Sequence, residues 1–385
     1  MVVLWVRRAA ESDTHSYHLS LHHSHLSLCA CFFTACLALA TARLGSTGAW
    51  QSGILYLTYT ASALLGATYI VKQAGARNAL WFGMTLYCAY VACFWVATTI
   101  REEEGQRIAA WTGAGIGGIG AGFLWTAQGA YFAQSAQAHA QYQGQEVSVS
   151  TSYLAGIFAF FYLAEEVVLR ILSTILAGRG WSWESIFGLY TVVTVLSTAA
   201  MPLVYNFPNE DDETDSSAAD IFNKVTAAVQ LLWKDPKMKH MVGLNAVFGF
   251  ASAFLNSYVN GQVLPVALDE KYIGVLSAWV SGVAAIMSLV FGKVTASSIG
   301  KGPVLVIGAC CFFGVVFPFV LQPNASAYGW GPLGSVYTLH GVGRATFEGT
   351  LKATFADYFA YEKEGAFANI ILQNGLAGAI GYVCK

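Results

Sequence analysis

Charged side chains recur inside long apolar segments of this chain, where each needs a partner or a function. Glu165, Glu166 and Arg170 lie near the middle of one such segment. Glu166 and Arg170 are four residues apart, so they can neutralise each other on one face of a helix. We therefore expect Glu165 to be the group available for chemistry, as a protonatable coupling site or a cation ligand. The alternative is a structural carboxylate, hydrogen-bonded to a neighbouring helix.

A second set of ionisable residues recurs every four positions, at His340, Arg344, Glu348 and Lys352. The spacing allows Arg344 to pair with Glu348, and Glu348 with Lys352, within one helix. A charged stripe of this kind is too costly to face lipid. It either lines a polar pathway or closes a gate, and the position of Lys352 near the end of its segment favours the gate. His340 could titrate near neutral pH, although a histidine in an apolar helix is more often simply hydrogen-bonded.

Uncharged polar side chains provide further candidates for a cavity. Trp125, Gln128 and Tyr131 follow one another at one-turn spacing in another apolar segment, and Asn256 and Asn260 are one turn apart in a third. The structural alternative for Gln128 is an interhelical hydrogen bond, typically worth under about 2 kcal/mol.

The composition indicates a membrane protein. The 385 residues are 56% hydrophobic and only 11% charged, whereas roughly a quarter of an ordinary soluble domain is charged. The net charge of -2 gives no reason to expect nucleic acid as a partner. The eight cysteines form no C-x-x-C pair and are interpreted as packing residues.

The sequence gives no support for an enzymatic activity. Gly115, Gly117 and Gly120 match the dinucleotide fingerprint G-x-G-x-x-G, but that motif requires a preceding strand and a soluble βαβ unit. Here it lies in an uncharged span, so the nucleotide interpretation is rejected. No Ser-His-Asp grouping, metal cluster or phosphate loop is found. We expect no enzymatic activity, no cofactor and no bound metal.

Segments of membrane-spanning length must position all of these residues. Eleven are predicted, and they divide into six and five at a polar interval. The predicted spans are 26–42, 51–71, 78–100, 108–132, 152–177, 185–205, 241–264, 272–291, 302–321, 327–350 and 366–384.

The expected organisation is an all-α polytopic bundle of two six-helix halves. Residues 1–25 form a histidine-rich tail. A histidine-rich tract can bind metal, but this one lacks spaced Cys or carboxylates, so a disordered tail is expected instead. Residues 26–205 form the N-terminal half, and 206–240 form a cytoplasmic loop with an interfacial helix. The C-terminal half, 241–385, is expected to be truncated before a twelfth helix. Lys and Arg are more frequent in the loops on the side of the N-terminus, which predicts a cytoplasmic N-terminus.

The loop helix is predicted from a capping box that begins at Ser217 and from an apolar face. The residues of that face are Ile221, Val225, Val229, Leu232 and Trp233.

Small residues in the fourth span are spaced for close helix packing. Gly113, Gly117 and Ala121 form one row at i, i+4 spacing, and Gly118 and Gly122 form another. We expect this helix to let other helices come close.

An internal repeat relates the two halves. Gly75 and Gly83 correspond to Gly300 and Gly308 at one constant offset, and Gly118-Ile119-Gly120 corresponds to Gly341-Val342-Gly343. A third match, Gly156 with Gly365, aligns Glu165 with Asn374. Three matches in order predict parallel half-repeats.

Two basic, glycine-rich turns and two longer motifs resemble a known family. The turns hold Lys72, Gly75 and Arg77 in one half and Gly300 and Lys301 in the other, and resemble the inner-loop motif of the major facilitator superfamily. The longer motifs, IGAGFLWTAQGAYF and KEGAFANIILQNGLAGAIG, resemble segments of its uncoordinated-93-like (Unc-93) family, and lie at 119–132 and 363–381.

This resemblance implies a fold and two classes of function. In the superfamily, helices one, four, seven and ten line the cavity, which would aim Trp125 and Gln128 inward, with Asn256 and Asn260 opposite. One function is a facilitator-type secondary transporter of a small solute or cation. The other is a non-transporting subunit that regulates an ion channel or escorts another membrane protein, as some Unc-93 proteins do.

Overall fold

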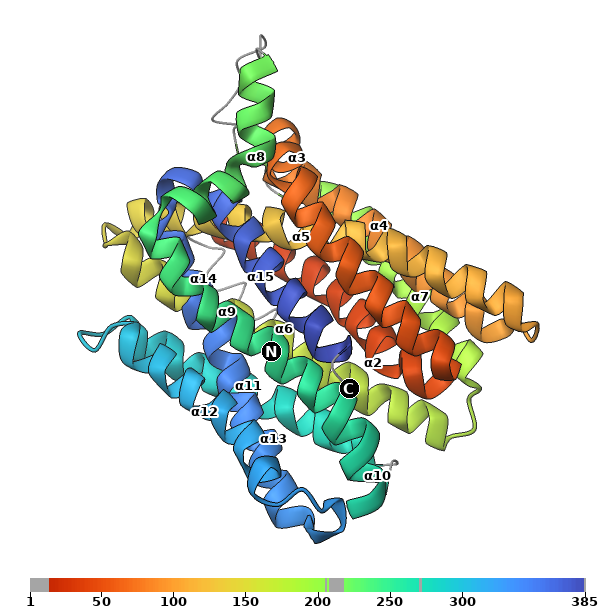
Figure 1. The fold of residues 1–385 in the computed structure, drawn as a ribbon. Helices are drawn as coiled ribbons and strands as arrows, with labels where there is room; N and C mark the ends of the chain where they lie inside the picture. The colour runs from red at the N-terminus through yellow and green to blue at the C-terminus, as the bar shows by residue number, and fades with distance from the viewer. Residues whose placement is uncertain (1–13, 205, 208–217, 270–271, 384–385) are drawn as a thin grey trace.

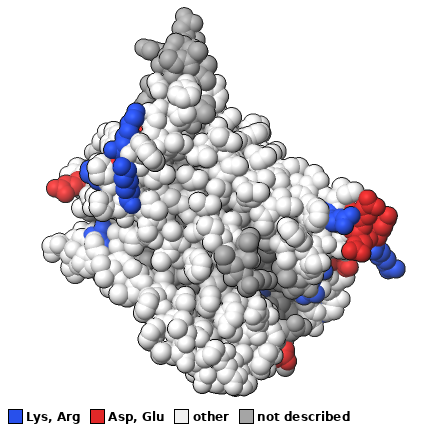
Figure 2. All heavy atoms as spheres, viewed as in Figure 1, with Lys and Arg blue, Asp and Glu red and all other residues white. Residues whose placement is uncertain are grey.

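A computed structural model describes residues 14–204, 206–207, 218–269 and 272–383, and every regular element among them is a helix. The helices form one elongated bundle (Figure 1). Seven helices in the described part are long and apolar enough to cross a membrane. In the view of Figure 2, charged side chains gather toward the ends of the bundle and leave its middle uncharged.

Helices cover all six spans predicted for the N-terminal half. Gly45, at φ 55° and ψ −129°, breaks the first long helix and so separates the first span from the second. The elements are α2 (Thr14–Ser62), η1 (Ala63–Ala67), α3 (Thr68–Ala74), α4 (Ala76–Thr99), α5 (Glu103–Gln143), α6 (Val147–Gly178), α7 (Trp183–Ala200) and η2 (Met201–Leu203).

The C-terminal half contains the other five predicted spans, and two of them are interrupted by π-helical turns, η3 and η6. The elements are α8 (Ala218–Lys234), α9 (Pro236–Phe254), η3 (Leu255–Val263), α10 (Leu264–Ala267), α11 (Ile273–Thr295), α12 (Gly302–Leu321), η5 (Ala325–Ala327), α13 (Trp330–Ala345), η6 (Thr346–Leu351), α14 (Lys352–Tyr358), η7 (Ala360–Glu362) and α15 (Lys363–Val383).

Two expectations about the ends of elements need correction. Residues 14–25, expected to be disordered, belong to α2. No Pro or Gly occurs between Thr14 and Leu44, so nothing in the sequence interrupts the helix there. The rest of the predicted tail, 1–13, lies outside the described residues. The fourth helix is also longer than predicted, because α5 extends past 108–132 on both sides.

The predicted loop helix exists as α8, and it packs on the bundle. Ala227, Ala228 and Leu231 are buried, and the Asn369 side chain of α15 donates a hydrogen bond to the Ala228 carbonyl at 2.7 Å. Trp233, on the predicted apolar face, is 79% exposed. Ser217 and the side chains of Ile221 and Val225 lie outside the described set.

The two glycine rows of α5 pack against two different helices. A Cβ on Gly117 would lie 2.8 Å from Tyr90 of α4, whereas one on Gly118 would lie 2.4 Å from the Leu55 carbonyl of α2. A Cβ on Gly122 would lie 2.0 Å from Ser62 Oγ of α2. The predicted close packing is therefore confirmed, since no side chain fits at these positions.

The glycines of the matched segments 118–120 and 341–343 make equivalent contacts. Gly118 packs on the second span of its half, and Gly341 packs on α11, the second span of its own half, at the Val280 carbonyl. Gly120 and Gly343 both face the third span, at Leu86 of α4 and Phe312 of α12. This part of the predicted repeat corresponds to a repeat in packing. The third match does not, because Gly156 packs on α11 whereas Gly365 lies against Glu362 and Ala227.

We predict that Gly118→Ala lowers the stability of the protein by about 1–3 kcal/mol, because the added methyl group overlaps the backbone of α2. Gly115→Ala is the matched control, since no atom lies within 4 Å of the Cβ position there. Thermal unfolding of both variants in detergent measures the difference. Equal melting temperatures would show that the rows do not hold the helices together.

Candidate functional site

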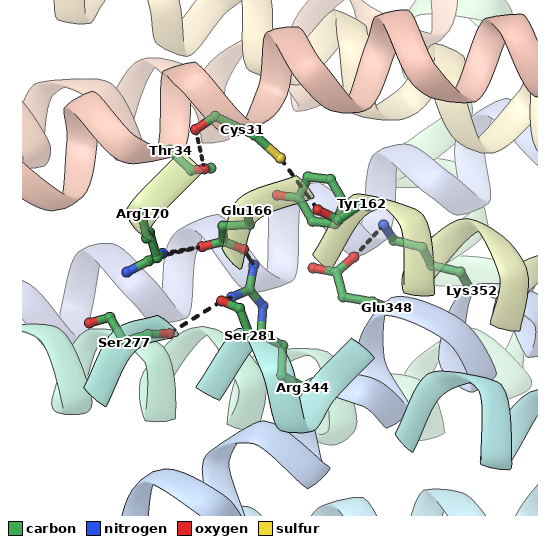
Figure 3. Close-up of polar contacts among 10 residues, drawn as sticks. All are labelled: Cys31, Thr34, Tyr162, Glu166, Arg170, Ser277, Ser281, Arg344, Glu348 and Lys352. Carbon is green, nitrogen blue, oxygen red and sulfur yellow. Dashed lines mark hydrogen bonds and ion pairs between the residues drawn. The ribbon is translucent and has the colours of Figure 1, made fainter. Parts of the chain in front are cut away.

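A buried carboxylate joins the two halves in the interior of the bundle (Figure 3). Glu166 of α6 is 2% exposed. Its Oε1 accepts hydrogen bonds from Arg170, one turn along the same helix, with Nε at 3.1 Å. Its Oε2 accepts a hydrogen bond from Arg344 Nη2, at the end of α13, at 2.6 Å. One carboxylate therefore serves two guanidinium groups, one from each half.

Close packing of α6 on α11 makes this bridge possible. A Cβ on Gly156 of α6 would lie 2.8 Å from Gly292 Cα of α11, so the two backbones are in contact. Ser281 of α11 accepts a hydrogen bond from Arg344 Nη1 at 3.3 Å, which orients the guanidinium from its other side. The predicted Glu166–Arg170 pair is present.

The predicted pairing of Arg344 with Glu348 is wrong. Glu348 pairs instead with Lys352, at 2.7 Å, which is the second of the two pairs predicted for this helix. Glu348 lies in η6, the π-helical turn that begins at Thr346. Arg344, just before this turn, instead uses its guanidinium for Glu166 of α6 and Ser281 of α11, while Glu348 and Lys352 still meet four residues apart.

Lys352 connects the halves through aromatic rings. It is 6% exposed, and its ammonium group lies 4.7 Å from the centre of the Trp125 ring and 5.7 Å from that of Phe158. Trp125 Nε1 donates a hydrogen bond to the Tyr87 hydroxyl at 3.0 Å, which fixes the indole. The expected inward orientation of Trp125 agrees with these contacts, a cation–π arrangement.

Glu165 has a different position from its neighbour. Its side chain is half-buried, and we expected it to have no partner. That is wrong, because Glu165 takes part in a polar or electrostatic interaction. Neither Arg170 nor Arg344 is bonded to it.

The remaining cavity candidates do not join the Glu166 network. Gln128 is buried, and its Oε1 has no hydrogen-bond partner among the described residues. Asn260 donates to Asn256 Oδ1 at 3.3 Å and accepts a hydrogen bond from the Tyr337 hydroxyl. Tyr131 stacks edge-on against Phe207.

Asn374, aligned by the repeat with Glu165, packs against α9. A Cβ on Gly249 would lie 2.3 Å from the Asn374 carbonyl oxygen.

His340 is buried, and neither ring nitrogen has a hydrogen-bond partner in the described part of the chain. A hydrogen-bonded histidine was the expectation there, and it is not met. The ring instead packs edge-on against Phe312, with centroids 5.8 Å apart.

The described residues contain no group of three or more His, Cys, Asp or Glu placed to hold a metal. The seven cysteines among them are free thiols.

The two basic turns lie at one end of the bundle, which we call the turn end. Gly75 and Gly300 have φ 78° and 74°, the left-handed region that glycine adopts without strain. Lys72 pairs with Glu362 of the other half at 2.8 Å. Arg77 Nη1 donates to the Val204 carbonyl at 3.4 Å.

The second turn reaches across to the N-terminal half. Lys301 pairs with Asp357 and donates to Ser148 Oγ at 2.8 Å. Thr151 Oγ1 donates to Asp357 Oδ1 at 2.7 Å. Sequence reasoning missed Asp357 and Glu362, although both are acidic residues just after the tenth span and could have been matched to the basic turns.

Comparison with known families decides the classification. The family model described as Major Facilitator Superfamily matches residues 26–382. The chain belongs to this superfamily. It is similar to UNC93-like protein 3 of Arabidopsis thaliana, 23% identical over 347 residues that make up 86% of this chain and 72% of that protein. Human Protein unc-93 homolog A is 22% identical over 371 residues, 85% of this chain and 78% of the relative. The Unc-93-like resemblance is confirmed.

Solved structures of the superfamily share the fold. The human organic anion transporter MFSD10 superposes with a TM-score of 0.71 at 13% identity, covering 97% of this chain and 93% of that one. The E. coli fucose:proton symporter FucP superposes with a TM-score of 0.67 at 13% identity, covering 96% and 90%. The protein is therefore a multi-pass membrane protein of the major facilitator fold.

We predict that Glu166→Gln is strongly destabilising. It leaves two buried guanidinium groups without their counter-charge, and breaking a buried pair in this way costs about 3–5 kcal/mol. Glu104→Gln, at an exposed position, is the control and should stay within about 0.5 kcal/mol of the unmodified protein. Melting temperature and the monodisperse fraction after extraction in detergent report the outcome. A Glu166→Gln protein as stable as the control would mean that the bridge does not contribute to folding.

Proposed function

We propose that this protein is a facilitator-type secondary transporter, which moves a small solute or ion by rocking its two halves. The observation that carries the proposal is the Glu166–Arg344 ion pair, which connects the halves inside the bundle. Charge in the membrane interior is expensive, and in membrane proteins it commonly marks a solute or ion pathway. We place the N-terminus in the cytoplasm on the distribution of Lys and Arg, so that the turn end faces the cytoplasm.

Contacts at the turn end suit a gate that opens and closes. Lys72 and Glu362 are partly buried, at 16% and 22% exposure, so their ion pair contributes somewhat more than the roughly 0–1 kcal/mol of a fully exposed pair. The Lys301–Asp357 pair is comparably exposed. Such pairs hold one arrangement of the halves weakly, so a bound solute with a few kcal/mol of preference could shift the balance.

A second candidate is a non-transporting subunit that regulates a channel or escorts another membrane protein. It is favoured by the ion pairs within the interior, because every member of this network has a partner of opposite charge. The members are Glu166, Arg170, Arg344, Glu348 and Lys352. A network in which each charge already has a partner suits a fixed assembly. The solutes named for the solved relatives, a sugar and organic anions, differ, so the shared fold selects none of them.

We predict two populations of the turn end in the lipid-reconstituted protein. Spectroscopic labels at exposed Gln143 and Tyr358, one in each half, should give a short and a long distance by pulsed electron resonance. Glu362→Gln removes the pair with Lys72 and should raise the long-distance fraction severalfold, since about 1 kcal/mol changes a two-state ratio about fivefold. Glu104→Gln, outside the turn end, is the matched control.

Flux separates the two candidate functions. Proteoliposomes incubated with a defined mixture of small organic solutes should accumulate one of them, as read by mass spectrometry of the vesicle contents. A single unchanging distance in both variants, together with no uptake, would refute the transporter and support the regulatory subunit. Membrane proteins that co-purify with the chain would then identify the partner.

A further inference from the structure

Arg170 and Arg344 bring more positive charge and more hydrogen-bond donors to the interface than their shared carboxylate uses. Both guanidinium groups bond to Glu166. Glu348, the next carboxylate along the tenth span, is held by Lys352 at 2.7 Å. Arg170, Arg344 and Glu166 therefore carry a net charge of +1 as a group, with the half-buried carboxylate of Glu165 as their neighbour on α6.

Several N–H groups of these arginines are unused. A guanidinium has five N–H donors. Arg170 uses Nε and Nη2, both toward Glu166. Arg344 uses Nη2 toward Glu166 and Nη1 toward Ser281. No residue in the described part of the chain accepts a hydrogen bond from Arg170 Nη1 or Arg344 Nε.

Hydroxyl groups of α11 lie at the same level. A Cβ on Gly274 would lie 3.8 Å from Thr174 Oγ1, and one on Gly282 would lie 4.0 Å from Val167 Cγ2. These two contacts fix an antiparallel register of α11 on α6, and they bracket Ser277. Ser277 therefore lies level with Arg170, and one turn before Ser281, the partner of Arg344 (Figure 3).

The cluster offers donors of a kind that recognises an anion. Ser277 is half-buried, and its hydroxyl makes no hydrogen bond to the described residues, while its backbone carbonyl accepts from Ser281 at 3.3 Å. Guanidinium groups present planar, paired donors that match a carboxylate, and charge-assisted bonds of this type are about twice as strong as neutral ones. The arginine side chains keep 18% and 13% exposure, whereas Glu166 is enclosed.

We propose that Arg170, Arg344 and Ser277 form a binding site for a small organic monoanion, a carboxylate. The site lies between α6 of one half and α11 and α13 of the other, so the anion contacts both halves at once. The inference rests on the proposed function in one respect, that the bound carboxylate is the transported solute. It replaces the expectation of a cation ligand at Glu165, because the unused groups at this interface are donors.

The test uses benzoate as the probe and benzamide as its neutral match in shape. Protein in lipid nanodiscs is titrated with each compound at fixed sodium chloride, and both the melting temperature and the tryptophan fluorescence are recorded. Benzoate should raise the melting temperature saturably, whereas benzamide should not. Arg170→Gln and Ser277→Ala should each weaken the apparent benzoate affinity, the first by about tenfold, as for a lost charge-assisted hydrogen bond.

Two features make the test decisive. Arg170→Gln leaves Glu166 paired with Arg344, so the bridge between the halves persists, and Ser277→Ala removes only a hydroxyl group. Arg179→Gln, at an exposed position of the same half, is the control and should bind benzoate as the unmodified protein does. Equal effects of benzoate and benzamide, or unchanged benzoate affinity in Arg170→Gln, would overturn the proposal.

Binding and flux can fail separately. The titration needs no gradient and no transport step, so benzoate binding without uptake would uphold the site and refute transport. Uptake of a cation by protein that does not bind benzoate would refute the site and uphold transport.

Discussion

Charge buried inside a membrane must be balanced within the protein, and the position of Glu166 shows how this chain meets that constraint. An isolated carboxylate or guanidinium in the interior would be costly, and neither can be moved to the surface without unpacking a helix. Glu166 takes one arginine from its own helix and one from the other half. The arrangement of α6, α11 and α13 follows from that need, because the three helices must bring these groups within hydrogen-bonding distance.

Close contact between backbones is what allows such distances. Gly156 and Gly292 let α6 and α11 touch, and the rows of α5 do the same for α2 and α4. In lipid there is little hydrophobic drive to bring helices together, so van der Waals packing between small residues and interhelical hydrogen bonds have to supply it. Gly117 and Gly120, two of the three glycines that match the nucleotide fingerprint, therefore serve the same purpose as the charges, which is to hold the helices together.

Local patterns were readable from the sequence, whereas partners distant in the chain were not. The spans, the glycine rows, and the pairs Glu166–Arg170 and Glu348–Lys352 all follow from one helix and its period. The bond from Arg344 to Glu166 joins residues 178 apart in sequence, and no periodicity specifies it. The Arg344–Glu348 prediction failed because it considered one helix alone, whereas Arg344 finds its partners on α6 and α11. The acidic partners of the basic turns were accessible in principle, since charge balance at one end of the bundle required them.

The π-turn η6 also bears on how this span can change in evolution. Such a turn is equivalent to one inserted residue in an α-helix, and each residue rotates the helix by about 100°. Deleting one residue between Thr346 and Leu351 would convert the π-turn to a regular α-helical turn and leave Lys352 facing Trp125. A deletion elsewhere in the span would not be absorbed in this way and would rotate Lys352 away from the ring. A change of length by one residue is therefore expected to be tolerated best in this short stretch, while its side chains, buried throughout, are constrained by packing and, at Glu348, by the ion pair with Lys352.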